Sequence, residues 1–274
     1  MKLLYESLRQ TNVMGIKEYF DKAIIFNVDN VAEFYYQSNQ VKWDIHTDFP
    51  SIMPPFKYSF FEYTPPSVGM FQEGVKFITP GIRFGTFIVK HDVAEDDGLQ
   101  SILECVLFGS KNEVPFFLGS IRMAVDKYGA MKPLPGQNEE APIQYLLPDG
   151  ILQDTLDQTF RPILLAISFL HCKNVTRIVR GAGTNFGKRN RHEASVRYHV
   201  LNIEPMKKIL KTEGSSESVG LKKALHICRG HFKDYRETGL FGKFYDIYWW
   251  EPQVRGSQDN GIVLKDYKIS KPIN

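Results

Sequence analysis

The sequence predicts an α+β fold in which antiparallel sheets pack around a long, Pro-kinked buried helix. Two patterns predict it. Between residues 81 and 126, apolar and other side chains alternate with period two, which is typical of strands that bury one face. Between Leu152 and Cys172, apolar side chains instead recur at steps of three and four residues, which indicates a helix with a wide apolar surface. Pro162 lies inside this stretch and removes one backbone donor, so we expect it to kink the helix or split it in two.

In the first 66 residues, the sequence predicts short helices, a strand and an extended segment. Residues 3–8 are typical of an amphipathic helix, and residues 23–28 indicate a strand. Asp29 or Asn30 would cap the short helix that follows. Several prolines then exclude regular structure throughout, but residues 56–63 are too apolar for an exposed loop, so we expect an extended segment packed on the core.

Three regions follow from these elements. Residues 1–131 form an N-terminal α+β region with an antiparallel meander, and residues 132–149 form a loop because they begin with prolines and polar residues. Residues 150–274 contain the helix and a basic, aromatic-rich β region. The alternative is that all these regions belong to one continuous domain. In this last region we expect a second sheet that covers the helix, with strands at residues 175–179, 196–203, 225–232, 244–250 and 262–269.

Positive charge is unevenly distributed along the chain. A net charge of +3 over 274 residues does not by itself indicate a nucleic-acid-binding protein. From Lys173 to Lys243, however, sixteen Lys and Arg stand against six Asp and Glu, a local balance of +10. Lys188, Arg189 and Arg191 form the densest run. They would contact phosphates without reading sequence, or form a solvated hairpin tip.

Cysteine usage and hydropathy indicate a cytoplasmic protein. Cys105, Cys172 and Cys228 show no metal-ligand spacing, so we expect reduced thiols. The longest apolar run, Pro162 to Leu170, is far shorter than the ~20 residues needed to cross a bilayer. We therefore expect no membrane among the partners.

The last quarter of the chain interleaves histidine and lysine with aromatic residues and glycine, which is chemistry suited to proton transfer near phosphates. His226 or His231 would act as the base, and Tyr235 or Lys243 would donate a proton or stabilise charge. A regular strand would place the two histidines on opposite faces, whereas a bulge at Gly230 would bring them to one side. The alternative is that both histidines bond backbone carbonyls and catalyse nothing.

The same region supplies candidate ligand-binding side chains. Arg229 and Arg255 would hold a phosphate, because the planar guanidinium matches phosphate oxygens. Trp249 and Trp250 would stack on flat rings. The alternative is that the arginines stack on these aromatic residues as part of a sheet.

Motifs of defined mechanism are absent from the sequence. Gly239 to Lys243 lacks the spacing of a phosphate-binding P-loop, and no HExxH or GxSxG motif occurs. His46 among Asp44 and Asp48, and His91 before Asp92, fit no metal-ligand pattern. We therefore expect neither a metal nor a cofactor.

The C-terminal run His226-x-x-Arg-Gly-His-Phe-x-x-Tyr235, with Gly239-Leu-Phe-Gly-Lys243, Trp249-Trp250 and Val254-Arg-Gly256, resembles a pattern in uncharacterised proteins of bacteriophages and bacterial mobile elements. This resemblance implies a phage or mobile-element context and no particular activity.

Two functions follow. The first is binding of nucleic acid or a nucleotide-like phosphate ligand by the basic, aromatic C-terminal half. If the histidines are catalytic, the protein would also be a nuclease that cleaves phosphodiester bonds without a metal. The alternative is a non-enzymatic interaction protein that binds and occludes a host protein through its aromatic surface. The sequence does not decide whether the protein is an enzyme.

Overall fold

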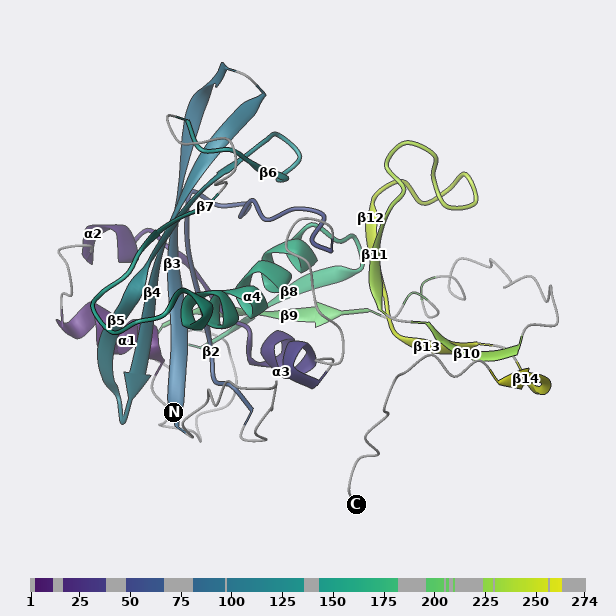
Figure 1. The fold of residues 1–274 in the computed structure, drawn as a ribbon, viewed down its shortest axis with the longest axis horizontal. Helices are drawn as coiled ribbons and strands as arrows, with labels where there is room; N and C mark the ends of the chain where they lie inside the picture. Colours follow the sequence, from purple (N-terminus) through teal and green to yellow (C-terminus); the bar gives the residue numbers. More distant parts are fainter. Residues whose placement is uncertain are drawn as a thin grey trace.

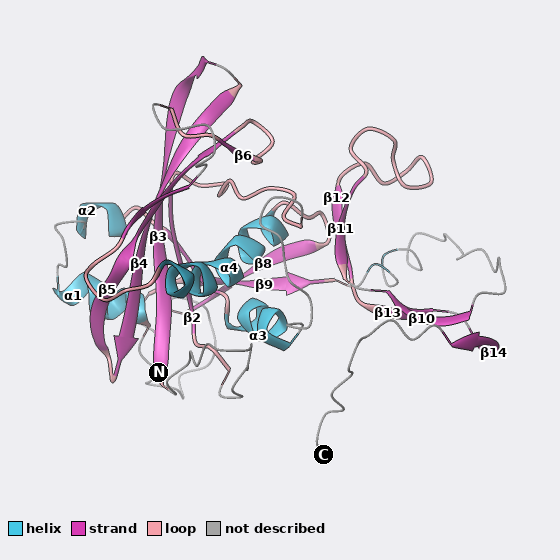
Figure 2. Ribbon diagram, viewed as in Figure 1, coloured by secondary structure: helices cyan, strands magenta, loops and turns pink. Residues whose placement is uncertain are grey.

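One nine-stranded mixed sheet organises the chain (Figures 1 and 2). The strand order is β6-β5-β4-β3-β2-β1-β9-β8, and β7 pairs with β5 beside β6. The structure is a computed structural model, and it describes residues 3–11, 17–37, 48–66, 81–96, 98–135, 143–181, 196–204, 206, 209, 224–228, 230–255 and 257–262.

The centre of the sheet is parallel and its two sides are antiparallel. β1 (Ile24–Asn27) runs parallel to both β2 (Tyr58–Tyr63) and β9 (Tyr198–Ile203). The other pairings described in this sheet are antiparallel. Its remaining strands are β3 (Ile82–Asp96), β4 (Leu99–Lys111), β5 (Val114–Val125), β6 (Met131–Lys132), β7 (Ile143–Leu146) and β8 (Val175–Arg180).

The predicted fold class is wrong. We expected antiparallel sheets around a long, Pro-kinked buried helix, and the structure instead has a largely β architecture built on a single mixed sheet. α4 (Gln153–Leu170), which contains Pro162, lies against one face of this sheet and is not enclosed between sheets. β8 and β9, which we expected in a second sheet, extend the main sheet through β1. The parallel pairing joins segments far apart in sequence, and local periodicity does not encode such pairing.

The antiparallel meander predicted for residues 81 to 126 is confirmed by β3, β4 and β5. Its register places Ile88 opposite Cys105, and Cys105 opposite Ile121, so all three lie on one face. The turn between β4 and β5 contains Asn112 and Glu113 with positive φ. The extended segment expected at residues 56–63 is β2, whose side chains are almost all buried.

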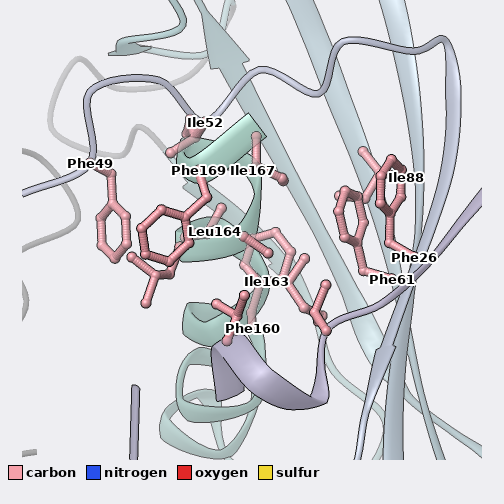
Figure 3. Close-up of a cluster of buried hydrophobic side chains, with 14 of the residues drawn as sticks. Phe26, Phe49, Ile52, Phe61, Ile88, Phe160, Ile163, Leu164, Ile167 and Phe169 are labelled. Carbon is pink, nitrogen blue, oxygen red and sulfur yellow. The ribbon is translucent and has the colours of Figure 1, made fainter. Parts of the chain in front are cut away.

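Helices cover both faces of the sheet. Neighbouring residues of a strand point to opposite sides, so the apolar central strands present an apolar surface on each face. One cluster joins α1 (Leu4–Thr11) and α2 (Lys17–Phe20) to the sheet; its sheet residues are Ile25, Phe60, Phe87 and Phe108. The other cluster joins α3 (Asp29–Gln37) and α4 to the opposite face. Figure 3 shows part of this second cluster, with labelled sheet residues Phe26, Phe61 and Ile88 and labelled helix residues Phe160, Ile163, Leu164, Ile167 and Phe169.

In the part of the chain that the structure describes, five short strands follow β9. β11 (His231–Asp234) pairs with β12 (Ile247–Trp250), and β10 (Ala224–Cys228) pairs with β13 (Gln253–Arg255) and β14 (Ser257–Ile262). The single strand expected at residues 225–232 is therefore divided between β10 and β11. Most of the strand expected at residues 262–269 lies outside the described residues. Of the loop expected at 132–149, residues 136–142 lie outside them, and Ile143–Leu146 form β7 where we expected a loop.

Candidate nucleic-acid interface

Two antiparallel strand pairs near the C-terminus share one register. β10 pairs with β13 and β11 with β12 in a single register, which runs without a shift from His226 opposite Arg255 to Asp234 opposite Ile247. The described pairs leave out Gly230, Glu251 and Pro252, and Pro252 supplies no backbone donor. We call residues 224–255 the C-terminal ribbon. Figure 1 shows it beside the end of β9, with a loop beyond β11 and β12.

The ribbon distributes the predicted catalytic residues along its length. His226 lies on β10, and its backbone is opposite that of Arg255. His231 is exposed on β11, Tyr235 is half-buried just after β11, and Lys243 is exposed in a turn of the loop. The predicted phosphate-binding residues that lie outside the described residues are Arg229, Lys188, Arg189 and Arg191.

Two of these candidates, His231 and Tyr235, follow one another along β11 and its end. Strand residues rise about 3.4 Å each, so the Cα atoms of His231 and Tyr235 are roughly 13 Å apart. Lys243 follows Tyr235 in the loop. A general base and a general acid must each come within about 3 Å of the group they serve. The described geometry therefore gives the predicted cleavage no support.

The tryptophans predicted to stack on a ligand are packed against the protein. Trp249 is only 2% exposed, and its ring centre lies 5.1 Å from Phe169, 5.6 Å from Phe34 and 4.7 Å from Phe232. Trp250 is also buried, and the Lys233 ammonium lies 5.9 Å from its ring centre. A ligand could stack on Trp249 only if these neighbouring rings were displaced.

Asn174 fixes the ribbon to the sheet. Its buried side chain accepts a hydrogen bond from the Trp249 backbone nitrogen (3.0 Å) and donates to the Trp249 carbonyl (3.0 Å). The same amide nitrogen donates to the carbonyl of Glu204 at the end of β9 (2.8 Å). Because the Trp249 backbone points toward Asn174, Trp249 and Phe232 form a non-hydrogen-bonded pair, in which side chains approach closely.

Positive charge is concentrated on the hairpin of β8 and β9. Residues 173–203, which we call the basic hairpin, hold seven Lys and Arg and one acidic residue, Glu193. The C-terminal ribbon is nearly neutral by comparison, with five basic and four acidic residues. β8 forms the edge of the nine-stranded sheet, so the basic hairpin lies at that edge.

Arginines lie on both faces of the basic hairpin. Arg177 lies on β8, with its guanidinium 5.1 Å from the Phe56 ring centre. Arg180 is three residues further along and therefore on the opposite face. His199 is on the same face as Arg177, and burial, followed by the charge of Arg177, lowers the pKa of His199. His199 is therefore neutral at pH 7, and the positive charge at this position comes from Arg177.

A serine and a histidine meet beside the ribbon but do not form a catalytic pair. His171 Nε2 lies 3.2 Å from Ser51 Oγ and 2.7 Å from the carbonyl oxygen of Met53. A carbonyl only accepts, so Nε2 carries the proton and cannot take one from Ser51. Burial is the main cause of the lowered pKa of His171. These contacts hold the segment around Ser51 against the end of α4.

The sequence did not reveal a buried polar cluster between the sheet and α1. Glu62 is fully buried on β2, forms an ion pair with Arg83, and accepts a hydrogen bond from the Tyr5 backbone nitrogen (3.0 Å). Asp29 lies 3.5 Å from Arg83 and accepts from the Thr64 backbone nitrogen (2.6 Å). Burial raises the pKa of Glu62 to about 7, although Arg83 and Tyr5 oppose the shift. Protein groups supply these contacts, which makes the cluster structural. The sequence feature that could have indicated this cluster is Glu62 itself, an acidic residue inside the apolar run of residues 60–63.

Among the described residues, no three His, Cys, Asp or Glu side chains gather in a way that could hold a metal ion. His91 contacts Glu104 (3.0 Å), whereas Asp92 accepts a hydrogen bond from Ser101 (3.3 Å). His46 and Asp44 lie outside the described residues.

Cys105 and Cys172 are free, buried thiols, and burial raises the pKa of each. The side chain of Cys228 is outside the described set. In the described part of the chain, no helix combines the length and the apolar character needed to span a membrane.

Comparison with known proteins adds no family. The chain matches no protein-family model and no curated protein sequence.

Proposed function

We propose that the protein binds nucleic acid through the phosphate backbone, with the basic hairpin as the main contact. The observation that carries this proposal is the ratio of seven basic residues to one acidic residue in residues 173–203. A duplex or single strand is a dense row of phosphates, and each Lys or Arg that approaches it releases condensed counterions. Such contacts fix position without reading base sequence.

The structure of the hairpin suits this role. β8 is an edge strand, so a long polyanion can approach it without first displacing another strand. Arg177 is held beside Phe56. An arginine supported in this way loses less conformational freedom when it binds a phosphate.

We infer a cytoplasmic protein of phage or mobile-element origin, supported by the free thiols and by the resemblance of residues 226–256. The histidines and Lys243 are distributed along the ribbon, so we propose binding alone. The experiment below distinguishes this function from the alternative, in which the partner is a host protein.

The test is the affinity for a fluorescent oligonucleotide at low salt. Replacing Lys188, Arg189 and Arg191 together by alanine should weaken binding by 10-fold or more, as expected when several phosphate contacts are lost, without changing the preference among base sequences. A matched control replaces Lys22, Lys90 and Lys111, which lie outside the basic hairpin and change the net charge equally. Equal losses in the two triple variants would show that only net charge matters. Absence of binding by the parent protein, together with its elution in complex with a host protein, would favour the alternative.

A further inference from the structure

The loop at the end of the C-terminal ribbon presents two aromatic side chains to solvent. In residues 236–246, which we call the ribbon tip, Phe241 is 64% exposed and Tyr245 is 55% exposed. The remaining aromatic residues between 230 and 252 are buried or half-buried: Phe232, Tyr235, Phe244, Tyr248, Trp249 and Trp250. Within this part of the ribbon, the accessible aromatic surface is therefore at the tip.

The backbone holds Phe241 outward in an unfavourable conformation. Its φ is +56°, in the left-handed region that bulky L residues rarely adopt. Gly242 follows with a φ of +66°. The turn is closed by hydrogen bonds from the Leu240 nitrogen to the Phe244 carbonyl (2.9 Å) and from the Phe244 nitrogen to the Leu240 carbonyl (3.2 Å). A strained residue with an exposed ring contributes little to folding, so it indicates a role in binding.

The rest of the tip is anchored. Leu240 and Phe244 pack with Tyr248 and Trp250 in a small apolar cluster. Gly239 lies directly beside the Tyr245 ring, since a Cβ at this position would be 2.8 Å from it. The tip is thus ordered before any partner arrives, which lowers the entropy cost of binding.

We propose that Phe241 and Tyr245 stack on the bases of the nucleic acid that the basic hairpin binds. This inference rests on the proposed function. The tip has two basic residues, Arg236 and Lys243, and two acidic residues, so its own charge would not attract a polyanion. The basic hairpin supplies that charge and is joined to the ribbon through Asn174. Exposed Lys243 lies between the two rings in sequence, where it can contact a phosphate next to a stacked base.

Stacking has a distinct experimental signature, because it needs the base and not the phosphate. We therefore compare two oligonucleotides of equal length, one normal and one with abasic sites throughout its centre. Phe241→Ala should bind the normal oligonucleotide about 5- to 150-fold more weakly than the parent protein does, the range for loss of one base-stacking contact. On the abasic oligonucleotide the two proteins should bind equally. Tyr245→Ala should show the same pattern.

Two further variants control for folding and for generic apolar contact. Phe241→Gly relieves the left-handed strain, so it should be at least as stable as the parent protein and still bind more weakly. Val114→Ala removes an exposed apolar side chain at the turn between β4 and β5 and should leave affinity unchanged. The stacking inference alone is overturned if the parent protein binds and Phe241→Ala binds equally well, or loses equally on both oligonucleotides. Failure of the parent protein to bind either oligonucleotide overturns the proposed function itself.

Discussion

Glu62 is a fully buried acid whose pKa is raised by burial. Its pKa is about 7 in the folded protein, against an ordinary value of 4.5. Between these values the folded state binds more protons than the unfolded state, so the contribution of Glu62 to stability falls as pH rises from about 4.5 to about 7. Above that range the contribution is constant.

Replacing Glu62 by glutamine tests this dependence. Glu62→Gln should remove the part of the pH dependence that lies between pH 4.5 and 7, and the two proteins should differ least at low pH, where protonated Glu62 is, like glutamine, a neutral partner of Arg83. Urea unfolding of both proteins across this range measures the difference. If the two stability curves stay parallel, Glu62 does not titrate in this interval.

Asn174 is the residue on which the position of the ribbon depends. Asn174→Ala would leave the buried backbone nitrogen and carbonyl of Trp249 without these partners, at a cost of about 1 to 3 kcal/mol for each group. The tryptophan emission should also shift to the red as Trp249 becomes hydrated. Asn202→Ala is the matched control, since Asn202 is exposed on β9. Equal unfolding free energies for the two variants would contradict the anchoring role.

Sequence reasoning identified charges better than contacts at this scale. The excess of Lys and Arg after residue 173 is a count, and no folding is needed to find it. Whether Trp249 faces solvent or the core depends on Phe34 and Phe169, which come from helices far away in sequence. An alternating strand pattern gives the parity of a side chain but not which face is buried.

For the elements of the fold, α4 offers the most direct test of packing. Ile167 is completely buried against the sheet, so Ile167→Ala should lower the free energy of unfolding by about 2 to 5 kcal/mol. Thermal or urea unfolding measures it. Leu152→Ala is the control, because Leu152 is exposed just before the helix begins. A loss no larger than that of the control would mean that α4 does not pack as described.

The elements differ in how far the sequence predicted them. β3, β4 and β5 are connected by short turns and pair with their chain neighbours, so period-two alternation and turn residues were enough. β1 pairs with β9, so Phe26 lies opposite His199 although most of the chain separates these two residues in sequence. Such a pairing follows from how the whole chain closes its sheet, and no local pattern carries it.

At the scale of the whole molecule, the two candidate contact regions join the strands β8 and β9 at different points along the chain. The ribbon attaches through Asn174 immediately before β8, whereas the run at residues 188–191 belongs to the connection from β8 to β9. A bound strand would contact the basic hairpin through phosphates and the ribbon tip through bases. The first of these contacts, between the basic hairpin and phosphates, supplies most of the binding energy that we propose.

The salt dependence of binding tests that claim most directly. The logarithm of the binding constant for a single-stranded oligonucleotide should fall linearly with the logarithm of salt concentration, by about 0.7 for each phosphate neutralised. Replacing Lys188, Arg189 and Arg191 by alanine should reduce this slope by roughly 2. We expect a steep slope for the parent protein and a shallower one for the variant. An affinity that does not change with salt, or an identical slope in both proteins, would contradict this expectation.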